Sequence, residues 1–186
     1  CEQHPEIEKA AIRQPLFVVG LPRTGTSILH ELLAQDPANR VPMTWEVMHP
    51  FPPPEAASFE SDPRIAKVDT HFSGIDRLLP DFKTMHPMGA RLPQECVAIT
   101  QHEFASMVWH TSNRVPSYQN WLEGADLRQV YESHKRWLQV LQWKAPAERW
   151  VLKSPGHLWA LDALLAVYPD ARIVQNHRDP LKVVAS

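Results

Sequence analysis

Residues 16–27 read LFVVGLPRTGTS, a short apolar run followed by a turn that contains Gly20 and Gly25. Apolar residues then recur with helical spacing at Ile28, Leu29, Leu32 and Leu33. The stretch therefore predicts a strand, a tight turn and a helix, in that order. Such units are the building blocks of α/β folds, in which helices cover a parallel sheet.

The turn has the spacing GxxxxGxS, from Gly20 to Ser27. Two glycines let the backbone turn tightly and present consecutive N–H groups to an anion, and the following helix directs the positive end of its dipole to the same place. Arg23 adds a planar cation suited to phosphate oxygens. The turn thus predicts a phosphate-binding loop. Thr26 stands where ATP-type loops carry lysine, and the strand ending at Asn176 lacks an acid, which argues against Mg-dependent nucleotide chemistry.

Apolar patterns in the rest of the chain predict a helix from residue 127 to about 146, a strand at 150–152, a helix over 158–168 and a strand at 172–175. Strands alternating with helices favour a three-layer α/β/α fold with a parallel sheet. Ligands of such sheets bind at the carboxyl ends of the strands. We therefore expect one cleft to bring together Gly20, Arg23, Lys153 and Arg178.

Length and composition indicate one ordinary globular domain, residues 1–186. Most of the 18 prolines lie between residues 37 and 93, so residues 37–124 are expected to form a loop-rich insertion, with helix around 94–110. A net charge of −2 argues against a nucleic-acid partner. Cys1 and Cys96 lack disulfide or metal spacing, and no apolar run is long enough to span a membrane, which favours a reducing, cytoplasmic setting without a metal.

Three segments resemble the PAPS-dependent sulfotransferases, which use 3′-phosphoadenosine 5′-phosphosulfate (PAPS) as sulfuryl donor. Residues 22–27 (PRTGTS) are similar to the loop that holds the 5′-phosphosulfate. Arg178-Asp179-Pro180, with Ser186 eight residues after the arginine, resembles the 3′-phosphate site, and LKSPGHL at residues 152–158 resembles a third strand-end segment. The resemblance covers residues 16–46 and 150–186 well. It implies a P-loop-like fold, PAPS as co-substrate, no metal, and a catalytic domain truncated at its C-terminus.

The resemblance also implies roles for individual residues. Arg23, Thr24, Gly25, Thr26 and Ser27 would hold the 5′-phosphosulfate, and Arg178 and Ser186 the 3′-phosphate. Lys153 would neutralise charge on the bridging oxygen during transfer, with Arg23 assisting. Sulfuryl transfer resembles phosphoryl transfer in being an in-line displacement that depends on positioning and electrostatic stabilisation.

The acceptor hydroxyl or amine also needs a base. We expect Glu46 to be that base. Tyrosylprotein sulfotransferases and several bacterial members of the family that the chain resembles carry a glutamate in a similar place, and a carboxylate desolvated beside Trp45 would have a raised pKa. Three rivals remain, namely His49, His86 and Glu95. Lipid, sugar, phenol and peptide hydroxyls all fit as acceptors.

Several aromatic residues complete the expected site. Trp45, Trp109 and Trp121 are candidates for the wall of an acceptor pocket. His134 lies on the apolar stripe of its helix and is expected to be a core histidine, and His157 is expected to orient the turn after Lys153 or to cap the following helix. Two other functions stay open: a P-loop kinase acting on a small molecule, and a nucleotide-binding module without catalysis.

Overall fold

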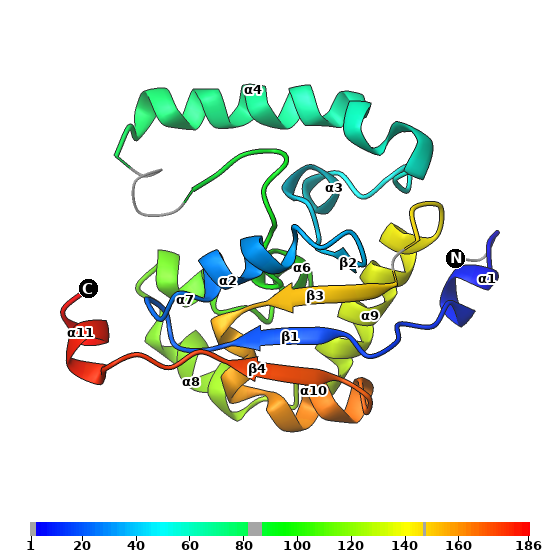
Figure 1. Ribbon diagram of the computed structural model, residues 1–186. Helices are drawn as coiled ribbons and strands as arrows, with labels where there is room; N and C mark the ends of the chain where they lie inside the picture. Colours follow the sequence, from blue (N-terminus) through cyan, green and yellow to red (C-terminus); the bar gives the residue numbers. More distant parts are fainter. Residues whose placement is uncertain (1–2, 82–86, 147) are drawn as a thin grey trace.

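The computed structural model describes residues 3–81, 87–146 and 148–186 (Figure 1). Its strands are β1 (Leu16–Val19), β2 (Asn39–Arg40), β3 (Arg149–Lys153) and β4 (Arg172–Gln175). Its helices are α1 (Glu6–Lys9), α2 (Thr26–Leu33), α3 (Thr44–Met48), α4 (Pro63–Leu78), α6 (Val97–Thr100), α7 (Val108–Ser112), α8 (Pro116–Gly124), α9 (Arg128–Gln142), α10 (Leu161–Val167) and α11 (Pro180–Val184). Three short 3-10 helices join them: η1 (Ala56–Ser61), η2 (Gln101–Glu103) and η3 (Pro155–Trp159).

The four strands form a parallel sheet in the order β2-β3-β1-β4. Val18 of β1 is in register with Lys153 of β3 on one side and with Val174 of β4 on the other. This arrangement confirms the predicted α/β class and the three predicted strands. The sequence did not predict β2, because a strand of two residues is too short to show a periodicity.

Helices cover both faces of the sheet (Figure 1). Alternate residues of a strand point to opposite faces. Accordingly Val18 and Val151 pack with Leu29 and Leu33 of α2 on one face, and Leu152 packs against α9 and α10 on the other. This produces the three predicted layers, and it places the N-terminus of α2 at the carboxyl end of β1.

The proline-rich region contains more regular structure than the sequence indicated. Helix α4 has 16 residues and lies beyond α3, with Ile65 and Val68 packed against Trp45. It forms because Pro63 occupies the first turn, where its missing N–H costs nothing, and the residues from 64 to 78 contain no further proline. The expected helix around 94–110 is instead divided into α6, η2 and α7, and Phe104, in the left-handed region (φ 55°), follows η2.

Helix α4 is also the longest helix of the described residues, and it carries many polar side chains. Within the described ranges, no helix combines the length and the apolar character needed to cross a bilayer.

Candidate functional site

The predicted phosphate loop lies between the carboxyl end of β1 and the start of α2. A Cβ atom on Gly20 would lie 2.8 Å from Thr24 Oγ1 and 3.1 Å from the carbonyl oxygen of Asn176, so a larger residue would displace the backbone. Gly25 has a φ of 90°, which L-amino acids rarely adopt. Both glycines are therefore required by the shape of the turn. The first helical N–H groups of α2 follow directly, as an anion-binding loop needs.

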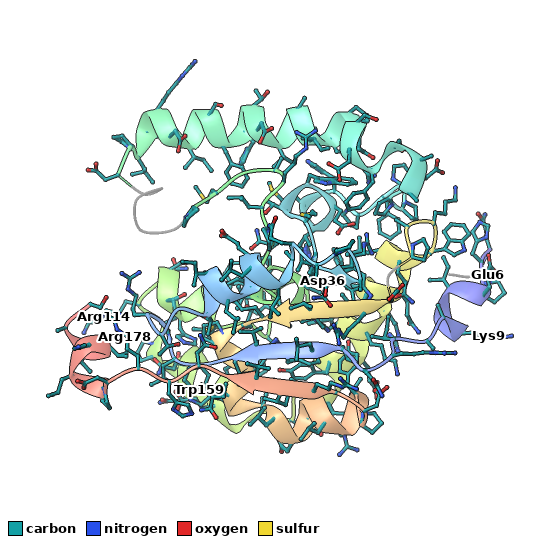
Figure 2. All side chains as sticks on the ribbon, viewed as in Figure 1. Glu6, Lys9, Asp36, Arg114, Trp159 and Arg178 are labelled. Carbon is teal, nitrogen blue, oxygen red and sulfur yellow. The ribbon has the colours of Figure 1, made fainter. Side chains whose placement is uncertain are left out.

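The residues predicted for the 3′-phosphate lie against this loop. Arg178 Nη1 donates a hydrogen bond to the carbonyl oxygen of Arg23 (2.9 Å), and Arg23 Nε donates to Ser186 Oγ (3.1 Å). They meet because β4 pairs with β1, so that both strands end at the same edge. Both arginines are exposed. Figure 2 shows Arg178 and Arg114 at the end of the molecule toward which the strands run.

Lys153 is buried at the carboxyl end of β3, beside the loop. Its Nζ donates to Ser27 Oγ (2.9 Å) and forms a close ion pair with Glu95 Oε1. Because side chains alternate along β3, Lys153 points to the face that carries α2 while Leu152 points to the opposite face. A cation thus lies at the first turn of α2. The predicted set Gly20, Arg23, Lys153 and Arg178 is therefore gathered along one edge of the sheet.

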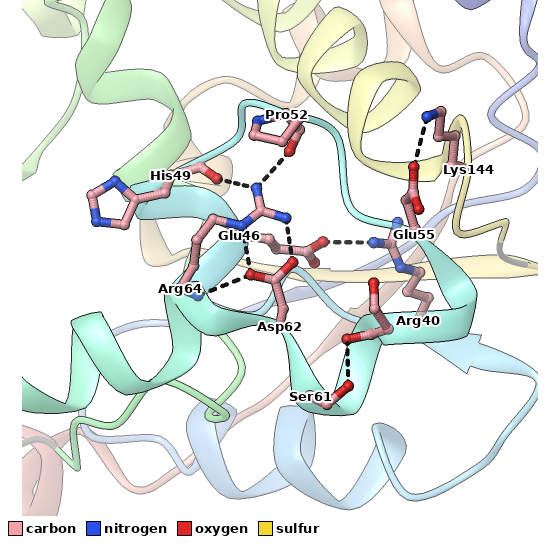
Figure 3. A network of polar contacts seen from close by, with 10 residues as sticks. Arg40, Glu46, His49, Pro52, Glu55, Ser61, Asp62, Arg64 and Lys144 are labelled. Atoms are coloured by element: carbon pink, nitrogen blue, oxygen red, sulfur yellow. Dashed lines mark hydrogen bonds and ion pairs between the residues drawn. The ribbon is translucent and has the colours of Figure 1, made fainter.

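Glu46 lies in a different environment, at the start of α3 (Figure 3). Its side chain is fully buried, accepts a hydrogen bond from Arg40 Nη2 (2.6 Å) at Oε2, and accepts one from the Met43 N–H (2.9 Å) at Oε1. Burial raises the pKa of Glu46 to about 7, and the charge of Arg40 opposes that rise. These partners belong to β2 and the segment after it, and not to the phosphate loop.

A second arginine network lies next to Glu46 (Figure 3). Arg64 pairs with Asp62 (Nη2 to Oδ2, 2.6 Å) and donates to the carbonyl oxygen of His49 (2.7 Å). Its guanidinium also lies over the ring of Trp45, at 4.6 Å from the centroid. His49 thus contributes backbone to this network, and burial lowers the pKa of its ring. The other histidine candidate, His86, lies outside the described residues.

Two of the three tryptophans predicted for an acceptor wall belong to one aromatic cluster, and the third lies apart. Trp45 is 1% exposed and packs edge-on against Phe59, inside the small core beneath α4. Trp121 on α8 is 53% exposed and contacts Tyr118. Trp109 on α7 contacts Phe104, which in turn contacts Tyr118. A different tryptophan, Trp159 of η3, lines an apolar cavity on the α9 face of the sheet.

The two expected structural histidines are buried, each with one tyrosine. His134 Nδ1 lies 2.8 Å from the hydroxyl of Tyr168, and His157 Nδ1 lies 2.7 Å from the hydroxyl of Tyr131. Burial lowers the pKa of His134 to about 3. This confirms the prediction that His134 is a core histidine. The turn after Lys153 is capped by Ser154 Oγ, which accepts a hydrogen bond from the N–H of Gly156 (3.1 Å).

Sequence reasoning missed one residue of this edge and did not predict the partner of another. Asn176 follows β4, donates its N–H to the carbonyl oxygen of Val19 (2.9 Å), and places its own carbonyl against Gly20. Its position one residue after a strand was the available signal. Glu95 was only the last of the proposed bases, because its approach to Lys153 depends on the tertiary fold. In the described ranges, three or more His, Cys, Asp or Glu side chains do not gather as metal ligands would.

Known proteins resemble this chain in sequence and in fold. Residues 15–186 match the model of the family described as "Sulfotransferase family". The protein named omega-hydroxy-beta-dihydromenaquinone-9 sulfotransferase Stf3, in Mycobacterium bovis and in Mycobacterium tuberculosis, is 29% identical over 191 residues, which cover 92% of this chain and 44% of the relative.

Two solved structures are similar over 98% of this chain. Sulfotransferase STF1 from Mycobacterium tuberculosis is 39% identical with a TM-score of 0.87, and sulfotransferase STF9 from Mycobacterium avium is 38% identical with a TM-score of 0.88. The chain covers 50% and 47% of those two chains, so it spans about half the length of the proteins it matches. This likeness confirms the P-loop-like fold that the sequence predicted.

Proposed function

The chain belongs to the sulfotransferase family, and on that premise we propose that it transfers a sulfuryl group from PAPS to the hydroxyl or amine of an acceptor. We assign residues 1–186 to one sulfotransferase domain, with residues 37–124 on the acceptor side. The observation that carries the proposal is the cluster formed by the phosphate loop, Lys153 and Arg178 at one edge of the sheet.

The residues at this edge fit a donor with two phosphate groups. The backbone of Gly20 to Ser27 would receive the 5′-phosphosulfate, because it leads into the N-terminus of α2, where free N–H groups and the helix dipole favour an anion. Arg178 and Ser186, joined through Arg23, would receive the 3′-phosphate. The guanidinium groups of Arg23 and Arg178 are exposed, and each has N–H groups left to donate to phosphate oxygens. PAPS carries a 3′-phosphate and ATP does not, so the proposed contact of Arg178 with this phosphate would distinguish the two nucleotides.

Lys153 would stabilise the leaving phosphate oxygen as the bond from sulfur to that oxygen breaks. The acceptor oxygen forms the new bond to sulfur and gives its proton to a base. Glu46 was the first choice for this base, but its two oxygens already accept from Arg40 and from the Met43 N–H. The contacts of Glu95, whose carboxylate meets Lys153 at the edge of the loop, support Glu95 as the base instead.

The relatives favour one class of acceptor. The name of Stf3 states that it sulfates a hydroxylated menaquinone, which is a lipid. By analogy, a small apolar or lipid alcohol is the acceptor class that we propose for this chain, ahead of glycans. The aromatic and apolar residues of α6 to α8 are compatible with it.

Calorimetry without magnesium tests the donor site. Full-length protein should bind 3′-phosphoadenosine 5′-phosphate more tightly than ADP or AMP. Arg178→Ala should weaken that binding by about 10- to 100-fold, because one charge-assisted phosphate contact contributes about 1.5–3 kcal/mol. The same substitution at Arg172, an exposed arginine on β4 that donates to Gln14, is the matched control and should leave binding unchanged.

Two other outcomes would favour a different function. Equal binding of ADP, or binding only with magnesium, would favour a kinase. Binding of the 3′-phosphorylated nucleotide without any transfer to alcohols would favour a module that holds the nucleotide and does no chemistry.

A further inference from the structure

The phosphate loop contains two residues in the left-handed region of backbone conformation, Arg23 (φ 69°) and Gly25 (φ 90°). Glycine adopts this conformation at little cost. A residue with a side chain keeps it only where the surrounding structure holds it in place. Arg23 is therefore the point at which the shape of the loop depends on contacts from another part of the chain.

Two side chains that follow β4 provide such contacts, because they donate hydrogen bonds to consecutive carbonyl groups of the loop. Arg178 Nη1 donates to the carbonyl oxygen of Arg23 at 2.9 Å. Asn176 Nδ2 donates to the carbonyl oxygen of Thr24 at the longer distance of 3.5 Å. The same amide nitrogen lies 3.8 Å from the position that a Cβ atom on Gly25 would occupy. The segment after β4 thus holds the backbone of the loop that follows β1.

The planarity of the peptide bond relates these contacts to the N–H groups of the loop. In a trans peptide unit, the carbonyl of one residue and the N–H of the next point in opposite directions. Because Arg178 holds the Arg23 carbonyl, the N–H of Thr24 points to the other side of the backbone. Asn176 and the Thr24 carbonyl fix the N–H of Gly25 in the same way. Within the described residues, neither N–H group donates to another group of the protein, so both are available to an anion.

We propose that Asn176 and Arg178 are positioning residues for the phosphate loop, which keep the N–H groups of Thr24 and Gly25 directed toward the 5′-phosphosulfate. This inference rests on the proposed function, and it gives Arg178 a second role beside its contact with the 3′-phosphate. Arg178 uses Nη1 for the loop, so its other N–H groups can still contact a phosphate. The loss of Arg178 should therefore also weaken the binding of nucleotides that carry no 3′-phosphate.

Calorimetry with ADP, which lacks the 3′-phosphate, separates the two roles of Arg178. Full-length Arg178→Ala protein should bind ADP about 3- to 10-fold more weakly than the parent, as the loss of one hydrogen bond predicts. Asn176→Ala changes no charge, and it should weaken the binding of ADP and of 3′-phosphoadenosine 5′-phosphate by the same factor, about threefold. Arg172→Ala and Gln175→Ala, at exposed positions on β4, are the matched controls and should keep the parent affinities.

A second measurement needs no nucleotide. The chain contains six glycines, so protein labelled with 15N-glycine gives few amide resonances to resolve. In the nucleotide-free state, Asn176→Ala and Arg178→Ala should each broaden the Gly25 resonance, because the released loop exchanges between conformations on the microsecond to millisecond timescale. The resonance of Gly124, at the end of α8, should stay sharp in both variants and show that the fold is retained.

Two results would overturn the inference. One is ADP binding by Arg178→Ala at the parent affinity, and the other is a Gly25 resonance that is as sharp in both variants as in the parent. Failure of the proposed function would look different, because the parent protein would then bind neither nucleotide while the broadening of Gly25 in the variants persisted.

Discussion

Glu95 is a partly buried carboxylate and Glu46 is a fully buried one, and the two have different partners. Glu46 is held by the Arg40 guanidinium and a backbone N–H, so both of its carboxylate oxygens already have a donor within the protein. Glu95 pairs with Lys153, which also contacts Ser27 of the phosphate loop. At the scale of single residues, the identity of the partner is the reason that we propose Glu95, and not Glu46, as the base.

We therefore predict that Glu95→Gln lowers kcat by about 10²- to 10⁴-fold, the usual contribution of a general base. Affinity for 3′-phosphoadenosine 5′-phosphate should stay unchanged. Steady-state kinetics with a primary alcohol acceptor and calorimetry with the nucleotide measure the two effects.

Glu46→Gln is the matched control for Glu95→Gln. It should retain the parent kcat in the folded fraction, because Glu46 contacts Arg40 and the Met43 N–H and not the phosphate loop. A folded Glu46→Gln protein that has lost catalysis would assign the base to Glu46.

At the scale of elements, glycine has opposite effects in α4 and in the phosphate loop. Gly74 lies within α4, and a Cβ atom there would meet nothing within 4 Å. The glycine adds only backbone entropy that folding must remove. Gly20, in contrast, is enclosed by Thr24 and Asn176.

Gly74→Ala should therefore raise the free energy of unfolding by about 1 kcal/mol and leave nucleotide affinity unchanged. Gly20→Ala, the same chemical change, should lower the affinity for 3′-phosphoadenosine 5′-phosphate at least 10-fold. Urea denaturation and calorimetry measure the two quantities. A Gly20→Ala protein with normal affinity would show that the loop does not form the phosphate cradle.

At the scale of the whole molecule, the core holds three neutral histidines. Burial lowers the pKa of His30 to about 4 and that of His134 to about 3, and it holds the pKa of His157 well below its usual value. Between pH 4 and 6.5 the unfolded chain binds protons at these sites and the folded protein does not, so stability rises with pH. Glu46 acts in the opposite direction, because its raised pKa lets the folded protein hold a proton between about pH 4.5 and 7.

We predict a net difference of about two protons between pH 5 and 6, which corresponds to at most ~2.7 kcal/mol of stability lost per unit of acidification. Urea denaturation at pH 5, 6 and 7 measures this slope. His30→Gln, which can still donate to the carbonyl oxygen of Val151, should reduce the slope by about one proton. A slope of zero in the parent protein would mean that the histidines are not buried as neutral rings.

The sequence by itself determined the strands at residues 16–19, 150–152 and 172–175, the phosphate loop and the parallel sheet, because strand periodicity and glycine spacing are local properties of the chain. Parallel pairing then brings Arg178 to Arg23 across 155 residues. Only the tertiary structure decided which carboxylate meets Lys153, because Glu95 lies 58 residues away and approaches it through the folding of α6. It also decided that Arg40 neutralises Glu46 and that α6 to α9 enclose a cavity. Burial and charge pairing depend on how segments pack against one another, and the spacing of those segments along the chain does not predict their packing.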